Sequence, residues 1–121
     1  MNKPTCLIAD DALFMRTMLK NILGEEYDVV GEAPNGLAAI ELAGNLKPDF
    51  MTLDITMPEL DGIEAIEKIH EASPDTKIIM CSAMGQRSKV IEAIQKGASD
   101  YIVKPFERDR VLQAIDNVLN R

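Results

Sequence analysis

The sequence predicts an α/β fold in which one mainly parallel sheet carries helices on both faces. Five short apolar runs of strand length alternate with helix-like segments about every 25 residues. Such alternation is typical of βαβ units, whose right-handed crossovers place helices on both sides of a sheet. The 121 residues are enough for one domain with a substantial core, so we expect a single domain over residues 1–121.

The five predicted strands are short apolar runs bounded by polar or turn-forming residues. They cover residues 6–9, 29–30, 50–53, 78–81 and 101–103. Four of these runs lead directly into a polar residue with useful chemistry. The second run instead continues into Gly31 and Glu32 and adds no obvious chemistry.

A segment with helical periodicity follows each strand, because its apolar residues recur every three or four positions. In chain order these positions are Phe14, Met18 and Ile22; Ile40 and Ala43; Ile63, Ile66 and Ile69; Val90, Ile91 and Ile94; and Val111, Ile115 and Val118. The first helix is expected over about residues 12–23, with Gly24 after it. Asn35 is placed to cap the second helix. We expect the apolar stripes to pack on the sheet.

Composition argues against several classes of function. The net charge of −7 and the pI near 4.6 disfavour non-specific binding to nucleic acid or to an anionic membrane surface. No stretch reaches the roughly 18 consecutive apolar residues of a membrane span, and no signal peptide is evident, so we expect a cytoplasmic protein. Cys6 and Cys81 lie inside apolar strands and are expected to be free, buried thiols.

Polar residues at the ends of four predicted strands define the candidate site. They are Asp10, Asp11, Asp54, Ser82 and Lys104. Taken singly, each is an ordinary cap, loop or solvent-facing residue. The carboxyl ends of parallel strands meet at one edge of the sheet, however, and ligands bind in the crevice there. Three carboxylates, a hydroxyl and an ammonium are therefore predicted to converge.

This set of groups favours a divalent metal and a phosphoryl group. Three neighbouring carboxylates repel one another unless a cation joins them, and hard oxygen ligands suit Mg²⁺. A carboxylate such as Asp54 can act as a nucleophile and form an aspartyl phosphate. The ammonium of Lys104 and the hydroxyl of Ser82 can hold phosphoryl oxygens.

Four segments resemble the receiver domains of two-component response regulators, and the resemblance extends over the whole chain. The segments are residues 8–11, 53–62, 81–83 and 103–106. Residues 11–16 and 81–86 resemble most closely the stand-alone receivers of bacterial chemotaxis. The resemblance implies a flavodoxin-like sheet of five parallel strands in the order 2-1-3-4-5. It also implies that no output domain is attached.

The resemblance implies a metal site around the phosphoacceptor. Asp54 is expected to accept the phosphoryl group and to contact the metal. Asp11 is expected to bind Mg²⁺ directly, and Asp10 mainly through water. The backbone of Thr56 is expected to supply the third protein ligand and a contact to the phosphoryl group. Mn²⁺ is an acceptable substitute for Mg²⁺ in such a site.

The resemblance also implies how the phosphoryl group is held and sensed. Ser82, Lys104 and the backbone N–H of Ala83 are expected to bind its oxygens. Tyr101 is expected to be a switch residue together with Ser82 and Lys104, and the bond between Lys104 and Pro105 is expected to be cis.

The expected function is a phosphorylation-activated switch that catalyses only its own phosphotransfer and autodephosphorylation. A sensor histidine kinase of the chemotaxis type is the expected donor. The face formed by the fourth helix, fifth strand and fifth helix is expected to bind a flagellar motor-switch protein. A phosphatase is a further possible partner. The protein is expected to be a monomer that binds neither nucleic acid nor membrane.

Three other functions are alternatives to this one. A phosphorelay shuttle, or a receiver in another signalling circuit, would have the same fold and site and would differ only in its partners. A small phosphatase is disfavoured because Thr56, and not an acid, stands two residues after Asp54. A flavin-nucleotide binder is disfavoured because Asp10 and Asp11 would repel its phosphate and aromatic residues make up only 4% of the chain.

Overall fold

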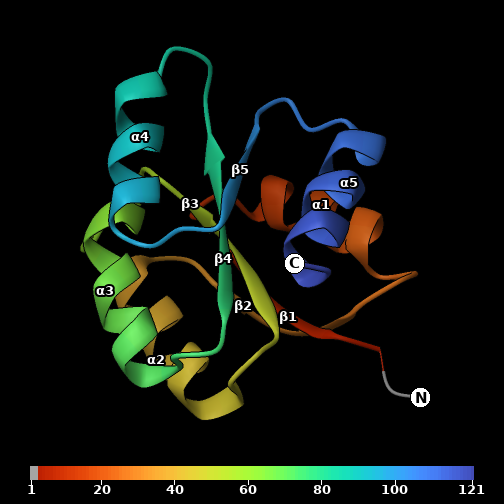
Figure 1. The fold of residues 1–121 in the computed structure, drawn as a ribbon, viewed down its shortest axis with the longest axis horizontal. Coiled ribbons are helices and arrows are strands. Elements are labelled where there is room, and N and C mark those ends of the chain that lie inside the picture. The colour runs from red at the N-terminus through yellow and green to blue at the C-terminus, as the bar shows by residue number, and fades with distance from the viewer. Residues whose placement is uncertain (1–2) are drawn as a thin grey trace.

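The described part of the chain, residues 3–121 of the computed structural model, forms a five-stranded sheet between two layers of helices (Figure 1). The strands are β1 (Thr5–Ala9), β2 (Asp28–Ala33), β3 (Phe50–Asp54), β4 (Lys77–Ser82) and β5 (Asp100–Val103). Their order is β2-β1-β3-β4-β5, and every neighbouring pair is parallel. The predicted flavodoxin-like topology is therefore confirmed.

The helices are α1 (Leu13–Leu23), α2 (Gly36–Leu46), α3 (Gly62–Ala72), α4 (Arg87–Gln95) and α5 (Arg108–Leu119). Figure 1 shows α1 and α5 on one face of the sheet and α2, α3 and α4 on the other. None of the described helices is both long enough and apolar enough to cross a membrane.

Strand side chains point alternately to opposite sides of the sheet. Because helices cover both sides, the side chains on both faces are buried. Leu7 and Met51 pack in the core beneath α2, α3 and α4, whereas Ile8 and Phe50 pack in the core beneath α1 and α5. Both predicted thiols, including Cys81 in β4, are free and buried. The strand ends that carry the polar residues thus rest on a rigid apolar framework.

Side-chain caps begin two of the helices. Asn35 accepts a hydrogen bond of 2.8 Å from the N–H of Ala38, and Asp61 accepts one of 2.9 Å from the N–H of Glu64. Short side chains with an oxygen acceptor are favoured at this position, because they satisfy an N–H group that has no partner within the helix. The predicted cap at Asn35 is confirmed.

The apolar stripe of α1 begins later than the sequence predicts. Leu19, Ile22 and Leu23 are buried, but Phe14 is 70% exposed and the neighbouring Leu13 is 66% exposed. The first turn of α1 stands at the open edge of the sheet, where none of the described elements covers these side chains. Helical spacing identified the helix correctly but placed Phe14 in the core wrongly.

The apolar stripe of α4 is also only partly buried. Val90 and Ala93 lie in the core, whereas Ile91 and Ile94 are 49% and 42% exposed. Beside them on β5, Tyr101 and Val103 are each 39% exposed. We call these four exposed residues, Ile91, Ile94, Tyr101 and Val103, the α4–β5 surface.

Gly62 allows α3 to begin directly against the end of β3. Its N–H donates a hydrogen bond of 2.9 Å to the carbonyl of Ile55, and a Cβ at this position would lie 2.1 Å from the carbonyl oxygen of Asp54. Gly62→Ala should therefore lower the free energy of unfolding by about 1–3 kcal/mol, the usual range for overpacking. Urea unfolding checks this prediction.

Gly44→Ala is the matched control, because an added Cβ there would meet only the Cβ of Ala72, at 3.3 Å. Helix propensity favours alanine over glycine inside α2, so we expect a smaller change than at Gly62. An unfolding midpoint for Gly62→Ala equal to that of the unchanged protein would show that the close approach to Asp54 has no energetic importance.

Candidate functional site

The polar residues predicted to form the site meet at the carboxyl edge of the sheet. Asp10 and Asp11 follow β1, Asp54 is the last residue of β3, and Ser82 is the last residue of β4. Because β3 lies between β1 and β4 in the sheet, Asp54 lies between the acidic pair and Ser82. The topology therefore brings together residues that are far apart in the sequence.

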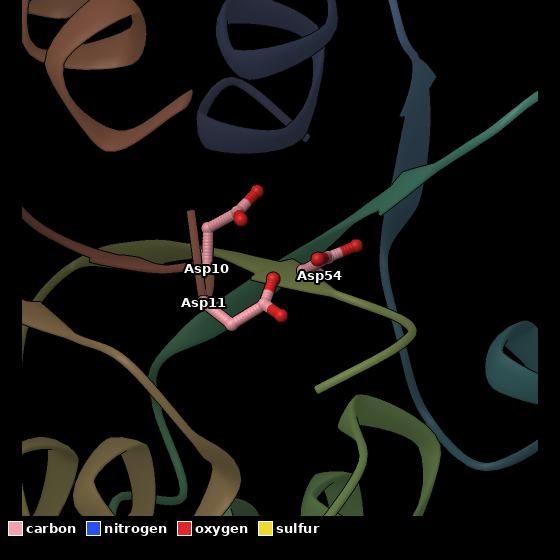
Figure 2. Close-up of side chains that lie close together, drawn as sticks. All are labelled: Asp10, Asp11 and Asp54. Carbon is pink, nitrogen blue, oxygen red and sulfur yellow. The ribbon is translucent and has the colours of Figure 1, made fainter. Parts of the chain in front are cut away.

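Asp10, Asp11 and Asp54 form a compact cluster of carboxylates. Each offers an oxygen, and these oxygens lie within 4.8 Å of one another. Figure 2 shows the three side chains extending from the ends of β1 and β3 with their carboxylates turned to the same side. Asp10 is 1% exposed and Asp54 is 5% exposed, whereas Asp11 faces solvent. The cluster is thus open to ligands on the side of Asp11.

Lys104 supplies a positive charge to this cluster. Its Nζ lies 3.0 Å from Oδ2 of Asp10 and 3.2 Å from Oδ2 of Asp54. Its backbone N–H donates a hydrogen bond of 2.8 Å to the carbonyl of Ser82, and the Lys104–Pro105 bond is cis, as the resemblance implies. Three ionised carboxylates and one ammonium leave the site with two uncompensated negative charges.

Burial and charge shift the pKa values of the two central groups. Burial raises the pKa of Asp54 to about 6, and the neighbouring charge of Asp10 adds to the rise while Lys104 opposes it. Burial acts to lower the pKa of Lys104, but its contacts with Asp10 and Asp54 outweigh burial and the pKa is raised. The lysine therefore stays charged, and Asp54 ionises only near neutral pH.

The donor set fits a divalent cation such as Mg²⁺. All the available donors are oxygens, which hard cations prefer. Within residues 3–121, the buried Oδ2 of Asp10 has no hydrogen-bond donor of suitable geometry beyond its ion pair with Lys104. The two positive charges of a divalent cation would balance the two uncompensated negative charges. Asp10, Asp11 and Asp54 are the side chains that could hold it, and Thr56 follows in the loop after β3.

Two hydrogen bonds of Gln86 link the loop after β3 to the loop after β4. The N–H of Ala83 donates a hydrogen bond of 2.7 Å to Oε1 of Gln86, and Nε2 of Gln86 donates one of 3.2 Å to Oγ1 of Thr56. Ser82 is buried, whereas Thr56 and Ala83 are exposed. The structure therefore places Ser82, Ala83 and Thr56 at the strand end and in the loops that border the end of β3, and it adds Gln86, to which the sequence assigned no role.

Tyr101 lies on β5 outside the carboxylate cluster. It lines a groove of about 660 Å³ between α4 and β5, and Ser82 and Ala83 line the same groove. The predicted switch residue is thus connected to the site through the end of β4.

Sequence reasoning missed a group of three charged residues that supports the turn after β1. Arg16 donates a hydrogen bond of 2.7 Å from Nη1 to the backbone carbonyl of Asp10, and its Nε lies 3.1 Å from Oε1 of Glu32. Lys20 lies 3.1 Å from the other oxygen of Glu32. The pKa of Glu32 is lowered by the hydrogen bond from Lys20, against the effect of burial, and by Arg16.

Glu32 belongs to the strand that was expected to add no obvious chemistry, and the structure gives it a supporting ion pair outside the carboxylate cluster. Arg16 and Lys20 are four residues apart and so share one face of α1. That spacing of two cations, opposite an acid on the neighbouring strand, was the available sequence signal. Arg16 binds the backbone carbonyl of Asp10, and Glu32 holds Arg16 in place. These two residues therefore position the segment that carries Asp10, without touching Asp54.

Comparison with known proteins gives close relatives over nearly the whole chain. The chemotaxis protein CheY of Listeria monocytogenes is 58% identical over 111 residues, which cover 91% of this chain and 93% of the relative. CheY of Bacillus subtilis is 56% identical over 115 residues, or 94% of this chain and 96% of the relative. These relatives act in chemotaxis by name.

A solved structure has the same fold. The CheX–CheY–BeF₃–Mg²⁺ complex from Borrelia burgdorferi matches with a TM-score of 0.90 at 36% identity, covering 97% of this chain and 90% of that chain. The family model of the response regulator receiver domain matches residues 6–116. With this match and the strand order 2-1-3-4-5, the chain belongs to the response regulator receiver domain family.

Proposed function

We propose that this chain is a cytoplasmic chemotaxis switch in which Asp54 accepts a phosphoryl group from a sensor histidine kinase. The observation that carries the proposal is the position of Asp54, a buried carboxylate between an acidic pair and an ammonium 3.2 Å away. The likeness to chemotaxis proteins, at 56–58% identity, supports the choice of circuit.

The proposed reaction transfers a phosphoryl group between two side chains. An oxygen of Asp54 forms a bond to phosphorus while the bond from phosphorus to the donor's imidazole nitrogen breaks, and the imidazole leaves with that electron pair. With its pKa at about 6, Asp54 is ionised and nucleophilic at neutral pH. Lys104, already at the carboxylate, offsets charge on the phosphoryl oxygens, and Ser82 offers a hydroxyl donor.

Mg²⁺, or Mn²⁺ in its place, is the proposed cofactor. Asp10, Asp11, Asp54 and the carbonyl of Thr56 are the groups proposed to hold it. When bound, the cation would neutralise charge on the carboxylates and on the phosphoryl group. The Borrelia burgdorferi relative was solved with BeF₃ and Mg²⁺, which supports this choice. We propose no external substrate, only the protein's own phosphotransfer and the later hydrolysis of its acyl phosphate.

The proposed output surface is the α4–β5 surface with the adjoining α5. Its groove is lined by apolar residues of α4 and β5 and reaches Ser82 and Ala83 at the site. Such a groove suits the apolar face of an amphipathic helix, here from a flagellar motor-switch protein. A phosphoryl group on Asp54 would draw Ser82 toward it and favour an inward Tyr101, which is a population shift biased by one covalent charge.

A protein phosphatase is a further proposed partner. The Borrelia burgdorferi CheY was solved in complex with CheX, which supports binding of a chemotaxis partner by receivers of this kind. The phosphatase would need access to Asp54, and the exposed side of the cluster at Asp11 offers such access.

Binding of a peptide from the N-terminus of a motor-switch protein tests the function. With Mg²⁺ and beryllofluoride, which mimics a phosphoryl group on Asp54, we expect binding to tighten by about tenfold, or 1.4 kcal/mol. Asp54→Ala should lose this gain. Lys104→Ala should also lose it, because Lys104 links the phosphoryl group to β5.

Lys68→Ala is the matched control for Lys104→Ala, since Lys68 is an exposed residue of α3 away from the α4–β5 surface. It should keep the full gain. If beryllofluoride leaves peptide affinity unchanged while still binding the site, the output is not a motor-switch protein, and a phosphorelay shuttle becomes the better proposal. A full gain in Lys104→Ala would contradict the proposed role of that lysine.

A further inference from the structure

Gln86 holds the backbone N–H of Ala83 at the edge of the site. The N···O distance to Oε1 is 2.7 Å, and Nε2 of the same carboxamide lies 3.2 Å from Oγ1 of Thr56. Because a backbone N–H can only donate, the carboxamide atom that faces Ala83 must be the oxygen. This fixes the orientation of the carboxamide, whose nitrogen then donates to Thr56.

The N–H of Ala83 lies in the loop after β4, at the same edge of the sheet as Asp54. Asp54 is paired in register with Cys81 of β4, and Ala83 comes two residues later at the same edge of the sheet. Ser82 lies between Cys81 and Ala83 in the sequence. The hydrogen bond from Ala83 to Gln86 therefore occupies a donor that stands beside the proposed acyl phosphate.

Gln86 does not form this bond as part of ordinary helix capping. It is the N-cap residue of α4, but in the part of the chain that the structure describes its side chain caps no N–H of that helix. The carboxamide instead reaches back to the loop after β4 and across to the loop after β3. Its two bonds thus link the two loops that border Asp54.

The segment before Gln86 is exposed and makes little packing contact. Gly85 has a φ of +87°, and, apart from Gly85 itself and its two chain neighbours, no described residue has an atom within 4 Å of the place where a Cβ would stand. Glycine adopts this region without strain. Ala83, Met84 and Gly85 are all exposed, so little packing opposes a movement of the carboxamide away from Ala83.

We propose that Gln86 is a resting-state competitor that the phosphoryl group must displace from the N–H of Ala83. The proposal rests on the phosphorylation of Asp54 proposed above. A phosphoryl oxygen is charged, and hydrogen bonds to charged acceptors are about twice as strong as those between neutral groups, so the phosphoryl group wins the donor. The displaced carboxamide then also releases Thr56, and the two loops are no longer linked.

Displacement of Gln86 would also change the groove between α4 and β5, which is the proposed output surface. Ala83, Gln86 and Tyr101 line the same groove between α4 and β5. Gln86 therefore does two things: it lowers the apparent affinity of the site for the phosphoryl group, and it couples occupation of the site to the shape of the groove.

Beryllofluoride titrations in the presence of Mg²⁺, followed by NMR of the backbone amides, test the proposal. Gln86→Met keeps the length of the side chain but removes the acceptor, and we expect about three- to tenfold tighter binding, the range that one net hydrogen bond represents. Gln86→Glu places a charged acceptor on the same N–H and should bind beryllofluoride more weakly than the unchanged protein.

Gln95→Met is the matched control, because Gln95 lies on the same helix and lines the same groove but is exposed at its other end. We expect its affinity to stay within about twofold, as for other surface changes. Equal affinities of Gln86→Met and Gln95→Met would overturn the role of Gln86. If the unchanged protein binds no beryllofluoride, or if Asp54→Ala still binds it, the proposed phosphorylation at Asp54 fails instead.

Hydrogen exchange in the absence of beryllofluoride gives a readout that does not depend on phosphorylation. The amide of Ala83 should exchange faster in Gln86→Met than in the unchanged protein, whereas Gln95→Met should leave it as it is. An unchanged exchange rate in Gln86→Met would show that the carboxamide does not protect this N–H, and the proposal would be wrong.

Discussion

Asp54→Asn should abolish incorporation of the phosphoryl group, with a loss of more than about 10³-fold in the rate of labelling. The carboxamide has nearly the size of the carboxylate but is not a nucleophile toward phosphorus. The buried position and the neighbouring Lys104 should be retained, because the substitution changes one atom and keeps the shape. Transfer of labelled phosphoryl from a sensor histidine kinase, in Mg²⁺, measures the loss.

Asp61→Asn is the control for this substitution. Asp61 follows in the same loop and caps α3 by accepting from the N–H of Glu64, and asparagine caps a helix about as well as aspartate. Labelling should stay close to that of the unchanged protein. Mg²⁺-dependent labelling that persists in Asp54→Asn at the normal rate would move the acceptor to another residue.

Asp54→Asn should also stabilise the metal-free protein at pH 8, by on the order of 3 kcal/mol, and this effect should disappear as the pH falls toward 4. The pKa of Asp54 is about 6 in the folded state, raised by burial and by Asp10 from the ordinary value of 3.8. A raised pKa means that the folded state binds the proton more tightly than the unfolded chain does. Stability from this group is therefore full below about pH 4 and is lost as the pH rises through about 6.

The substitution removes that loss, because asparagine does not ionise. Urea unfolding of both proteins in a chelator at several values of pH between 4 and 8 measures the difference. Mg²⁺ should stabilise the unchanged protein more at pH 8 than at pH 5, since it binds the ionised carboxylate. A difference that is constant across this range, or a less stable Asp54→Asn at pH 8, would contradict the raised pKa.

The strands and their common direction were predictable because their sequences are simple. Residues such as 50–53 form an apolar run that is buried on both faces, and an Asp ends it at the edge of the sheet. Parallel strands all carry their carboxyl ends to one edge, so the sequence alone places Asp10, Asp54 and Ser82 together. The strand order, in contrast, came from the resemblance to a family.

Contacts between loops and surface side chains were not predictable in the same way. The bridge made by Gln86 depends on the conformation of the loop after β4, in which Gly85 adopts a positive φ. Periodicity does not encode such a loop. The exposure of Phe14 likewise depends on what lies above the first turn of α1, and hydrophobic spacing describes only the helix itself.

The support of Asp10 by Arg16 and Glu32 was predictable only in part. The spacing of Arg16 and Lys20 on α1 was visible, but their common partner lies on β2, and only the pairing of β1 with β2 brings Glu32 next to them. A charge at a strand end is therefore informative once the neighbouring strand is known.

The measurement that tests the central claim most directly is the site of phosphorylation. After transfer from a sensor histidine kinase in Mg²⁺, reduction with borohydride converts an aspartyl phosphate into homoserine, which peptide mass spectrometry locates. We expect homoserine at position 54 and unchanged aspartate at positions 10 and 11. Homoserine at another position, or phosphate retained on a histidine, serine or threonine in place of Asp54, would contradict the account.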